Sequence, residues 1–222
     1  MSPRIAIVVG MKSEARIAAS GPGLTIVGGG SAARVEGLLD QAGRLDAVLS
    51  FGVVGGLAPH LRSGDLLAPE AVLSHSAVYP CHVGWARSLA RRLPGAHKGA
   101  LLGVDEPIRT PEHKRRLHDE TRAVAVDMES HGAARFAAKH GLPFAVLRAV
   151  SDPQHRAVPA AALAGFKADG SADVFAVLAA LVRSPGQTAS LVRTARDARA
   201  AFDALLGGRR LLGSLFGFDQ IA

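Results

Sequence analysis

Two short runs hold the side chains of this chain that are best suited to catalysis or ligand binding. Residues 126–130 (VDMES) place an acidic pair where a strand-like stretch turns into a helical one, and residues 148–152 (RAVSD) end another apolar run with a serine and a carboxylate. In open α/β sheets, ligands bind beyond the carboxyl ends of strands. We therefore expect Glu129 and Asp152 to meet at one sheet edge. There they would suit a substrate with a diol to hold and a leaving group to protonate.

Glycines follow three of the predicted strands. Glu14 lies four residues beyond Gly10, at the same predicted sheet edge, and is a candidate third carboxylate. The run 52–57 (GVVGGL) would let main chain approach a ligand closely or simply form a tight strand-exit turn. Residues 28–33 formally match the dinucleotide pattern G-x-G-x-x-A, but no acid ends the next strand, so the NAD interpretation fails. A turn whose N–H groups face an anion or a ribose remains an alternative.

Short apolar runs alternate with stretches of helical spacing. Strands are predicted at 5–9, 24–27, 47–51, 66–73, 100–104, 123–126 and 144–150, and helices at 12–19, 31–42, 85–92, 111–120, 128–140, 159–183 and 189–206. This alternation predicts an α/β fold with helices layered on a largely parallel central sheet. Pro111 at a first helical turn and Gly141 after His140 agree with helix punctuation.

Composition limits the class of protein. The 222 residues are 48% hydrophobic with one cysteine, Cys81, so the chain can bury a full core and form no internal disulfide. The net charge of +7 would attract acidic partners, but scattered arginines and only 5% aromatic residues argue against nucleic-acid binding. The first apolar run is short for a signal peptide, and none approaches the roughly 18 residues of a membrane span. We expect a cytoplasmic protein.

The C-terminal part differs in character from the rest. Between residues 183 and 210 it has six arginines against two aspartates, and apolar residues crowd its end. We expect a catalytic unit at residues 1–184 and a basic amphipathic helical extension at residues 185–222. The extension would either dock on the core or lie on a lipid surface, peripheral to the inner membrane.

Metal and cysteine chemistry find little support. The nine histidines include His113 and His118, which are five residues apart and off a shared helix face, and no H-E-x-x-H motif occurs. Cys81 has no orienting acid. We expect neither a metal nor a cofactor.

Together these motifs resemble the purine nucleoside phosphorylase and methylthioadenosine/adenosylhomocysteine nucleosidase superfamily. The matching stretches are 10–14, 52–59 with 64–65, 126–130 and 148–152, in the family's order over residues 1 to about 155. Residues 127–131 and 151–153, with the arginine-rich tail, look closest to the hopanoid-associated phosphorylases, thought to remove adenine from adenosylhopane. The resemblance implies a three-layer α/β/α fold with a mixed, largely parallel sheet, and a homo-oligomer, since relatives usually build part of the pocket across a subunit contact.

The resemblance also implies a role for each matching residue. Glu129 would accept hydrogen bonds from the ribose hydroxyls, with Met128 beneath the sugar, and Asp127 would also belong to the substrate-binding residues. Asp152 would protonate the purine at N7, with Ser151 helping to fix the base. Glu14 would orient an attacking water, and Gly55 and Gly56 would let the backbone pass close to the sugar.

Three departures from the family bear on substrate and nucleophile. Val53 stands where a serine often touches phosphate, and Pro107 stands where a base-stacking phenylalanine is common. Residues 74–98 look short, with Val78, Tyr79 and Trp85, which predicts a pocket open to a bulky apolar 5′-substituent.

The nucleophile stays open between water and phosphate. Glu14 favours water. The name of the closest branch favours phosphate as a co-substrate, which Arg16 or Arg34 could bind. Two other functions remain as alternatives to adenosylhopane cleavage. One is a methylthioadenosine/adenosylhomocysteine nucleosidase, and the other is a non-catalytic nucleoside-binding or membrane-associated protein.

Overall fold

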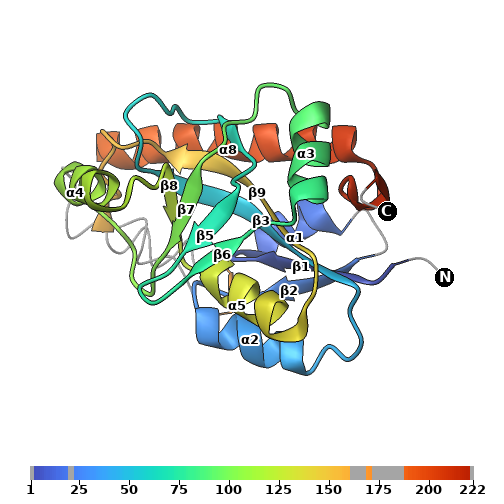
Figure 1. The fold of residues 1–222 in the computed structure, drawn as a ribbon. Helices are drawn as coiled ribbons and strands as arrows, with labels where there is room; N and C mark the ends of the chain where they lie inside the picture. The colour runs from blue at the N-terminus through green and yellow to red at the C-terminus, as the bar shows by residue number, and fades with distance from the viewer. Residues whose placement is uncertain (1–2, 20–22, 161–168, 172–187, 221–222) are drawn as a thin grey trace.

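Helices cover both faces of one central sheet in the computed structural model, which describes residues 3–19, 23–160, 169–171 and 188–220 (Figure 1). The strands are β1 (Ile5–Val9), β2 (Leu24–Val27), β3 (Ala47–Gly56), β4 (Leu66–Leu67), β5 (Ala71–Leu73), β6 (Val78–Pro80), β7 (Ala100–Gly103), β8 (Ala125–Asp127) and β9 (Phe144–Asp152). The helices are α1 (Lys12–Ala18), α2 (Ala32–Asp40), α3 (Val83–Arg92), α4 (Pro111–Thr121), α5 (Ser130–His140), α8 (Thr188–Leu212) and the short η2 (Phe218–Gln220).

The sheet separates two apolar cores, because successive side chains of a strand point to opposite faces. Ile5, Ile7 and Val9 of β1 belong to the core that includes side chains of α1, α3 and α8. Ala6 and Val8 of the same strand belong to the core that includes side chains of α2 and α5. The predicted three-layer α/β/α architecture is confirmed.

Strand order explains how distant segments reach one place. The order is β2-β1-β3-β8-β7-β5-β6, with β9 paired to β3 and β4 paired to β9. Most pairs are parallel, but β8 runs antiparallel to β3. Gly55 of β3 faces Val126 of β8 on one side and Asp152 of β9 on the other. The acidic segments therefore meet across β3, and not at the ends of two neighbouring parallel strands as a parallel sheet would place them.

The structure departs most from the predicted elements at three places. The glycine-rich run 52–56 is no turn but continues β3 alongside β9. The predicted strand 66–73 is divided into β4 and β5 around Pro69, which has no N–H to donate to a ladder. The edge strand β6 was not predicted. The predicted helix 159–183 falls almost entirely outside the described residues.

The helix signals at α4 and α5 are confirmed. Thr110 caps α4 by accepting from the His113 N–H at 3.3 Å, with Pro111 at the first helical position. Gly141 ends α5 with a left-handed φ of 64°, and its N–H donates back into the helix.

The C-terminal segment packs into the core of the sheet. Ala201, Leu205, Leu212 and Phe216 are buried in the core shared with α1 and α3. The Trp85 indole N–H donates to the Phe216 carbonyl at 2.8 Å, so the segment around Phe216 packs against α3. The described residues contain no helix of the length and apolarity that a bilayer crossing requires.

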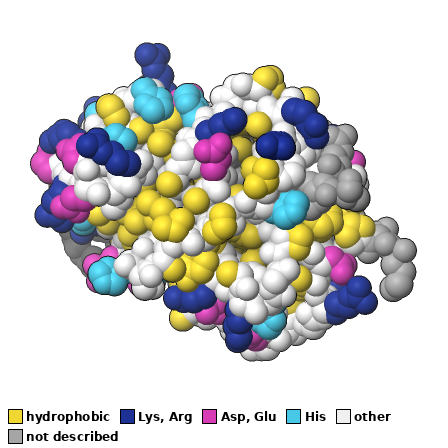
Figure 2. Space-filling model, in the orientation of Figure 1, with side chains coloured by type: hydrophobic (Ala, Val, Ile, Leu, Met, Phe, Trp, Pro, Cys, Tyr) yellow, Lys and Arg dark blue, Asp and Glu magenta, His cyan; other side chains and the backbone are white. Residues whose placement is uncertain are grey.

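Charged side chains do not form one basic patch on the visible face. Figure 2 shows lysine and arginine around the rim of this face, with hydrophobic side chains gathered across its middle. This distribution agrees with the scattered arginines of the sequence.

Candidate active site

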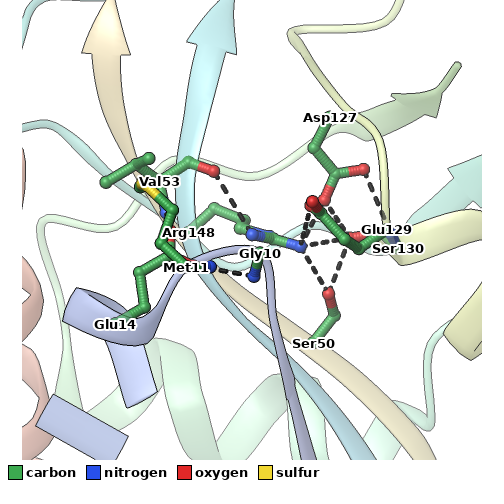
Figure 3. A network of polar contacts seen from close by, with 9 residues as sticks. All are labelled: Gly10, Met11, Glu14, Ser50, Val53, Asp127, Glu129, Ser130 and Arg148. Atoms are coloured by element: carbon green, nitrogen blue, oxygen red, sulfur yellow. Dashed lines mark hydrogen bonds and ion pairs between the residues drawn. The ribbon is translucent and has the colours of Figure 1, made fainter. Parts of the chain in front are cut away.

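Arg148 lies at the centre of a buried polar network (Figure 3). Its guanidinium pairs with the Asp127 carboxylate, lies 3.6 Å from Glu129 Oε2 and donates to Ser50 Oγ at 2.8 Å. On the other side it donates to the Val53 carbonyl at 3.2 Å. One fixed cation thus connects β3, β8, the start of α5 and β9. A planar guanidinium suits this task because it offers five donors in a rigid arrangement.

Three backbone N–H groups hold the Glu14 carboxylate. Its Oε2 accepts from the N–H groups of Gly10 and Met11 at 2.8 Å each, and its Oε1 accepts from Val53 N–H at 2.6 Å. Burial raises the pKa of Glu14, opposed by Arg148 and by these N–H donors. The carboxylate is therefore locked in position at the first turn of α1, facing the residues of β3.

Asp127 and Ser130 fix the turn from β8 into α5. The Ser130 N–H donates to Asp127 Oδ1 at 3.2 Å, and the Ser130 hydroxyl contacts the other carboxylate oxygen. Ser130 Oγ also lies 2.8 Å from Ser50 Oγ on β3. Asp127 is thus engaged by protein groups on both oxygens, which makes it a support for the turn that carries Glu129.

Glu129 is buried, and burial raises its pKa to about 7, against the lowering effect of Arg148. Glycines make room for it. A Cβ on Gly10 would lie 2.6 Å from Glu129 Oε1, and one on Gly28 would lie 3.0 Å from its Cγ. The Gly30 N–H donates to this carboxylate, while those of Gly28 and Gly29 donate to backbone carbonyls. The N–H groups of the glycine turn 28–30 are therefore used by Glu129 and by backbone carbonyls, and they are not free to bind a separate anion.

Asp152 and Ser151 end β9 beside the same space. Ser151 Oγ lies 2.6 Å from Asp152 Oδ1, and Asp152 Oδ2 lies 2.6 Å from the Lys114 ammonium. A Cβ on Gly55 would lie 3.2 Å from Asp152 Oδ2. Glycine at this position of β3 keeps the carboxylate open toward the cavity.

One cavity of about 190 Å³ gathers the predicted site residues. It is lined by Glu14, Gly55, Asp127, Met128, Glu129, Ser151 and Asp152, with an apolar wall that includes Val104, Pro107, Ile108 and Val158. Within the described residues no lysine or arginine lines it, so Arg16 and Arg34, both exposed, do not supply an anion site there.

Two placements differ from the prediction. Gly56 does not line the cavity, because it packs against Val150 and Pro153, where a Cβ would approach both within 3.2 Å. Val78, Tyr79 and Trp85 do not line it either, since Trp85 is buried under the chain end and Val78 is exposed on β6. The apolar lining of the cavity comes instead from Met11, Val53, Val54, Val104, Pro107, Ile108, Val126, Met128 and Val158.

The sequence reasoning assigned no role to Arg148 or Ser50 and missed Lys114. Arg148 belongs to the run 148–152, and an arginine in an otherwise apolar strand indicates that its charge has buried partners. Lys114 gives no such signal, because it lies among the charged residues of α4. Among the described residues, no group of histidines, cysteines and acids is arranged to hold a metal ion.

Residues 3–183 match the model of the Phosphorylase superfamily. The chain belongs to this superfamily. Among its relatives, the aminodeoxyfutalosine nucleosidase of Helicobacter pylori is 29% identical over 47% of this chain and 55% of its own length. The 5′-methylthioadenosine/S-adenosylhomocysteine nucleosidase of Geobacillus kaustophilus is 30% identical over 52% of this chain and 58% of its own length. The chain thus spans little more than half the length of the curated relatives it matches.

Solved structures show the same superfamily fold. A Helicobacter pylori MTAN mutant with 5′-methylthioadenosine in the active site has a TM-score of 0.66 at 16% identity, covering 94% of this chain and 98% of that one. An S-adenosylhomocysteine nucleosidase from Streptococcus pyogenes in complex with 5-methylthiotubericidin has a TM-score of 0.61 at 17% identity, covering 87% and 95%.

Proposed function

We propose that this member of the Phosphorylase superfamily hydrolyses the N-glycosidic bond of an adenine nucleoside. The observation that carries the proposal is the convergence of Glu14, Glu129 and Asp152 on one cavity. The relatives are named as nucleosidases of aminodeoxyfutalosine and of methylthioadenosine and adenosylhomocysteine, and these names support the substrate class.

The electrostatics of the cavity suit a cationic sugar. Breaking a bond between ribose and a nitrogen base builds positive charge on the sugar, as in the oxocarbenium-like states of glycoside hydrolysis. Ionised Glu129 would accept hydrogen bonds from the ribose hydroxyls and favour that charge. Arg148, Ser130 and Asp127 hold Glu129 and its turn in place, so the carboxylate needs little reorganisation as the charge develops.

Asp152 is placed to assist the leaving group. A purine anion leaves poorly, and a proton donated to N7 lets it depart as a neutral base. Ser151 and Lys114 each contact one oxygen of this carboxyl group, which fixes its plane beside the cavity.

Water fits the cavity better than phosphate as the nucleophile. Phosphate carries negative charge, and the cavity is lined by four acidic residues and by no lysine or arginine among the described residues. Glu14, with its oxygens fixed by three N–H groups, would orient a water and accept its proton. No cofactor is required for this chemistry.

The relatives favour methylthioadenosine, adenosylhomocysteine or aminodeoxyfutalosine as the substrate. Adenosylhopane is the second candidate, favoured by the apolar wall of Val104, Pro107, Ile108 and Val158, which would suit a bulky apolar group. The homo-oligomer and a lipid contact of the C-terminal segment remain predictions. Light scattering tests the first and vesicle co-sedimentation tests the second.

A product assay tests the function. Purified protein is offered methylthioadenosine, adenosylhomocysteine, aminodeoxyfutalosine and adenosylhopane, with and without phosphate, and adenine and the sugar product are identified by mass. We expect adenine and a free sugar whether or not phosphate is present. If the product is a sugar phosphate, the reaction is phosphorolysis and not hydrolysis. If no nucleoside releases adenine, the non-catalytic alternative is favoured.

Asp152→Asn is the decisive variant for this chemistry. The amide keeps the shape but cannot deliver a proton, so we expect kcat to fall by about 10² or more while the fold is kept. The matched control is Asp119→Asn, which alters an exposed carboxylate on α4. Equal turnover by the two variants would contradict the role of Asp152.

A further inference from the structure

Lys114 is a buried cation whose positive charge the proposed reaction has not yet used. It is the one buried residue of α4, and its side chain is 0% exposed. An ammonium group removed from water needs strong partners, because burying a charge without them is costly. The position of those partners therefore indicates what the lysine does.

Within the described part of the chain, the hydrogen-bond acceptors of this ammonium lie on one short segment, from Asp152 at the end of β9 to Arg156. Lys114 Nζ is 2.6 Å from Asp152 Oδ2, 2.8 Å from the Asp152 carbonyl, 3.2 Å from the Pro153 carbonyl and 3.0 Å from the Arg156 carbonyl. A lysine has three N–H donors, and here four acceptors surround them. Residues 152–156 thus surround a single cation that α4 supplies.

We infer that Lys114 is a positioning residue for Asp152, one that both orients its carboxyl group and supplies the charge beside it. The inference rests on the proposed function and extends it to a residue outside the cavity lining. With Lys114 on Oδ2 and Ser151 on Oδ1, the carboxyl group cannot rotate away from the cavity. The lysine acts through Asp152 and does not touch the nucleoside.

The charge matters at the step in which the base leaves. The bond between the anomeric carbon and N9 breaks, its electron pair goes to the purine, and the purine takes the proton of Asp152 at N7. Asp152 is left as a carboxylate, while water adds its oxygen to the sugar and gives a proton to Glu14. The Lys114 ammonium then stands 2.6 Å from the new negative charge. An opposite charge at that distance stabilises the carboxylate as it forms.

A purely structural role makes a different prediction. If Lys114 only held the turn together, its loss would disturb the whole cavity and weaken every ligand. A positioning role confines the loss to ligands whose N7 must receive a proton. A 7-deaza nucleoside has carbon in place of N7 and cannot accept that proton, so it separates the two roles.

The experiment compares Lys114→Gln with the wild type, with Asp152→Asn and with Lys139→Gln, which changes an exposed lysine on α5. Glutamine keeps two N–H donors for the carbonyls but removes the charge. For each protein, kcat is measured on methylthioadenosine, or on the nucleoside that the wild type cleaves fastest. The Kd of its 7-deaza analogue is measured by calorimetry, and thermal unfolding checks the fold.

We expect Lys114→Gln to lower kcat by about 10²-fold, the lower end of what a general acid contributes, with Kd for the 7-deaza analogue unchanged. Asp152→Asn should show the same pattern and Lys139→Gln no effect. Unchanged kcat in Lys114→Gln, or an equal loss in kcat and in 7-deaza binding, would overturn the inference while Asp152→Asn still supports the proposed function. Full activity of Asp152→Asn would instead remove the proposed function itself.

Discussion

At the scale of single residues, Glu129 shows how burial and function compete. Burial raises its pKa to about 7, although Arg148 lies 3.6 Å away and favours the charged form. The anion that would hold the ribose hydroxyls is therefore present above about pH 7 and is lost as pH falls through that value. The pH dependence of kcat/KM should thus rise with a midpoint near 7 on its acidic side.

Glu129→Gln tests this assignment. We expect kcat/KM to fall by about 10²-fold and its acidic limb to disappear, because glutamine neither titrates nor favours a cationic sugar. Glu70→Gln, at an exposed glutamate, is the control. A retained acidic limb with a midpoint near 7 would mean that another group causes it.

Glu129→Gln should increase the stability of the fold although it lowers activity. The pKa of Glu129 is near 7 in the folded state and 4.5 as its ordinary value, so between these pH values the native state binds a proton that the unfolded state has lost. Ionised Glu129 therefore lowers the free energy of unfolding by its full amount above pH 7 and by nothing below pH 4.5. We expect Glu129→Gln to be more stable than the wild type by roughly 1–3 kcal/mol at pH 8, with little difference at pH 4.5. Urea unfolding at the two pH values measures this difference.

At the scale of elements, the glycine-rich half of β3 is what allows the site to be compact. Gly52 has a φ of 148°, and a Cβ there would lie 2.7 Å from Arg148 Nη1 and would also collide with the Glu14 carboxyl group. The strand can therefore pass between the two charged groups only because it has no side chain at this point.

Gly52→Ala should disturb both stability and activity. We expect a loss of about 1–3 kcal/mol from the strained backbone and a marked fall in kcat/KM as Glu14 and Arg148 move. Gly37→Ala is the matched control, since a Cβ on this α2 glycine meets nothing within 4 Å and should stabilise the helix by about 0.5–1 kcal/mol. Chemical denaturation of both variants makes the comparison, and equal stabilities would contradict it.

The elements that the sequence predicted well are those with strong local patterns. The apolar run of β1 and the proline and glycine at the ends of α4 and α5 act within a few residues, so periodicity finds them. The continuation of β3 through residues 52–56 depends on pairing with β9 almost a hundred residues away. Lys114 likewise acquires its role from the chain after β9, and nothing within α4 marks it.

At the scale of the whole molecule, the C-terminal segment completes the core over β3 and β9. Phe216 is fully buried, its ring lies 5.4 Å from that of Phe51, and Arg209 stands 4.2 Å above it. The apolar residues that a lipid surface would have used thus lie largely inside. Val192, Leu206 and Leu211 remain exposed on α8, and a lipid contact of this helix would use them.

Phe216→Ala should therefore destabilise the entire protein. Truncating a buried phenylalanine costs about 3–5 kcal/mol, and unfolding should remain a single transition because this core is shared with β1, β3 and β9. Leu211→Ala, at a side chain that is 62% exposed, should change stability by less than about 0.5 kcal/mol. Differential scanning calorimetry of the two variants distinguishes a shared core from a loosely attached tail.

The hydrogen bond from Trp85 to the Phe216 carbonyl makes tryptophan fluorescence a probe of the C-terminal segment. The chain contains a single tryptophan, and its indole is fully buried, with its N–H bonded to Phe216 and its ring 4.9 Å from that of Phe218. Emission excited at the red edge of the indole band thus comes from one fluorophore at the joint between α3 and the chain end. A shift of that emission to longer wavelength would report that water reaches the indole, as expected when Phe216 and Phe218 separate from α3.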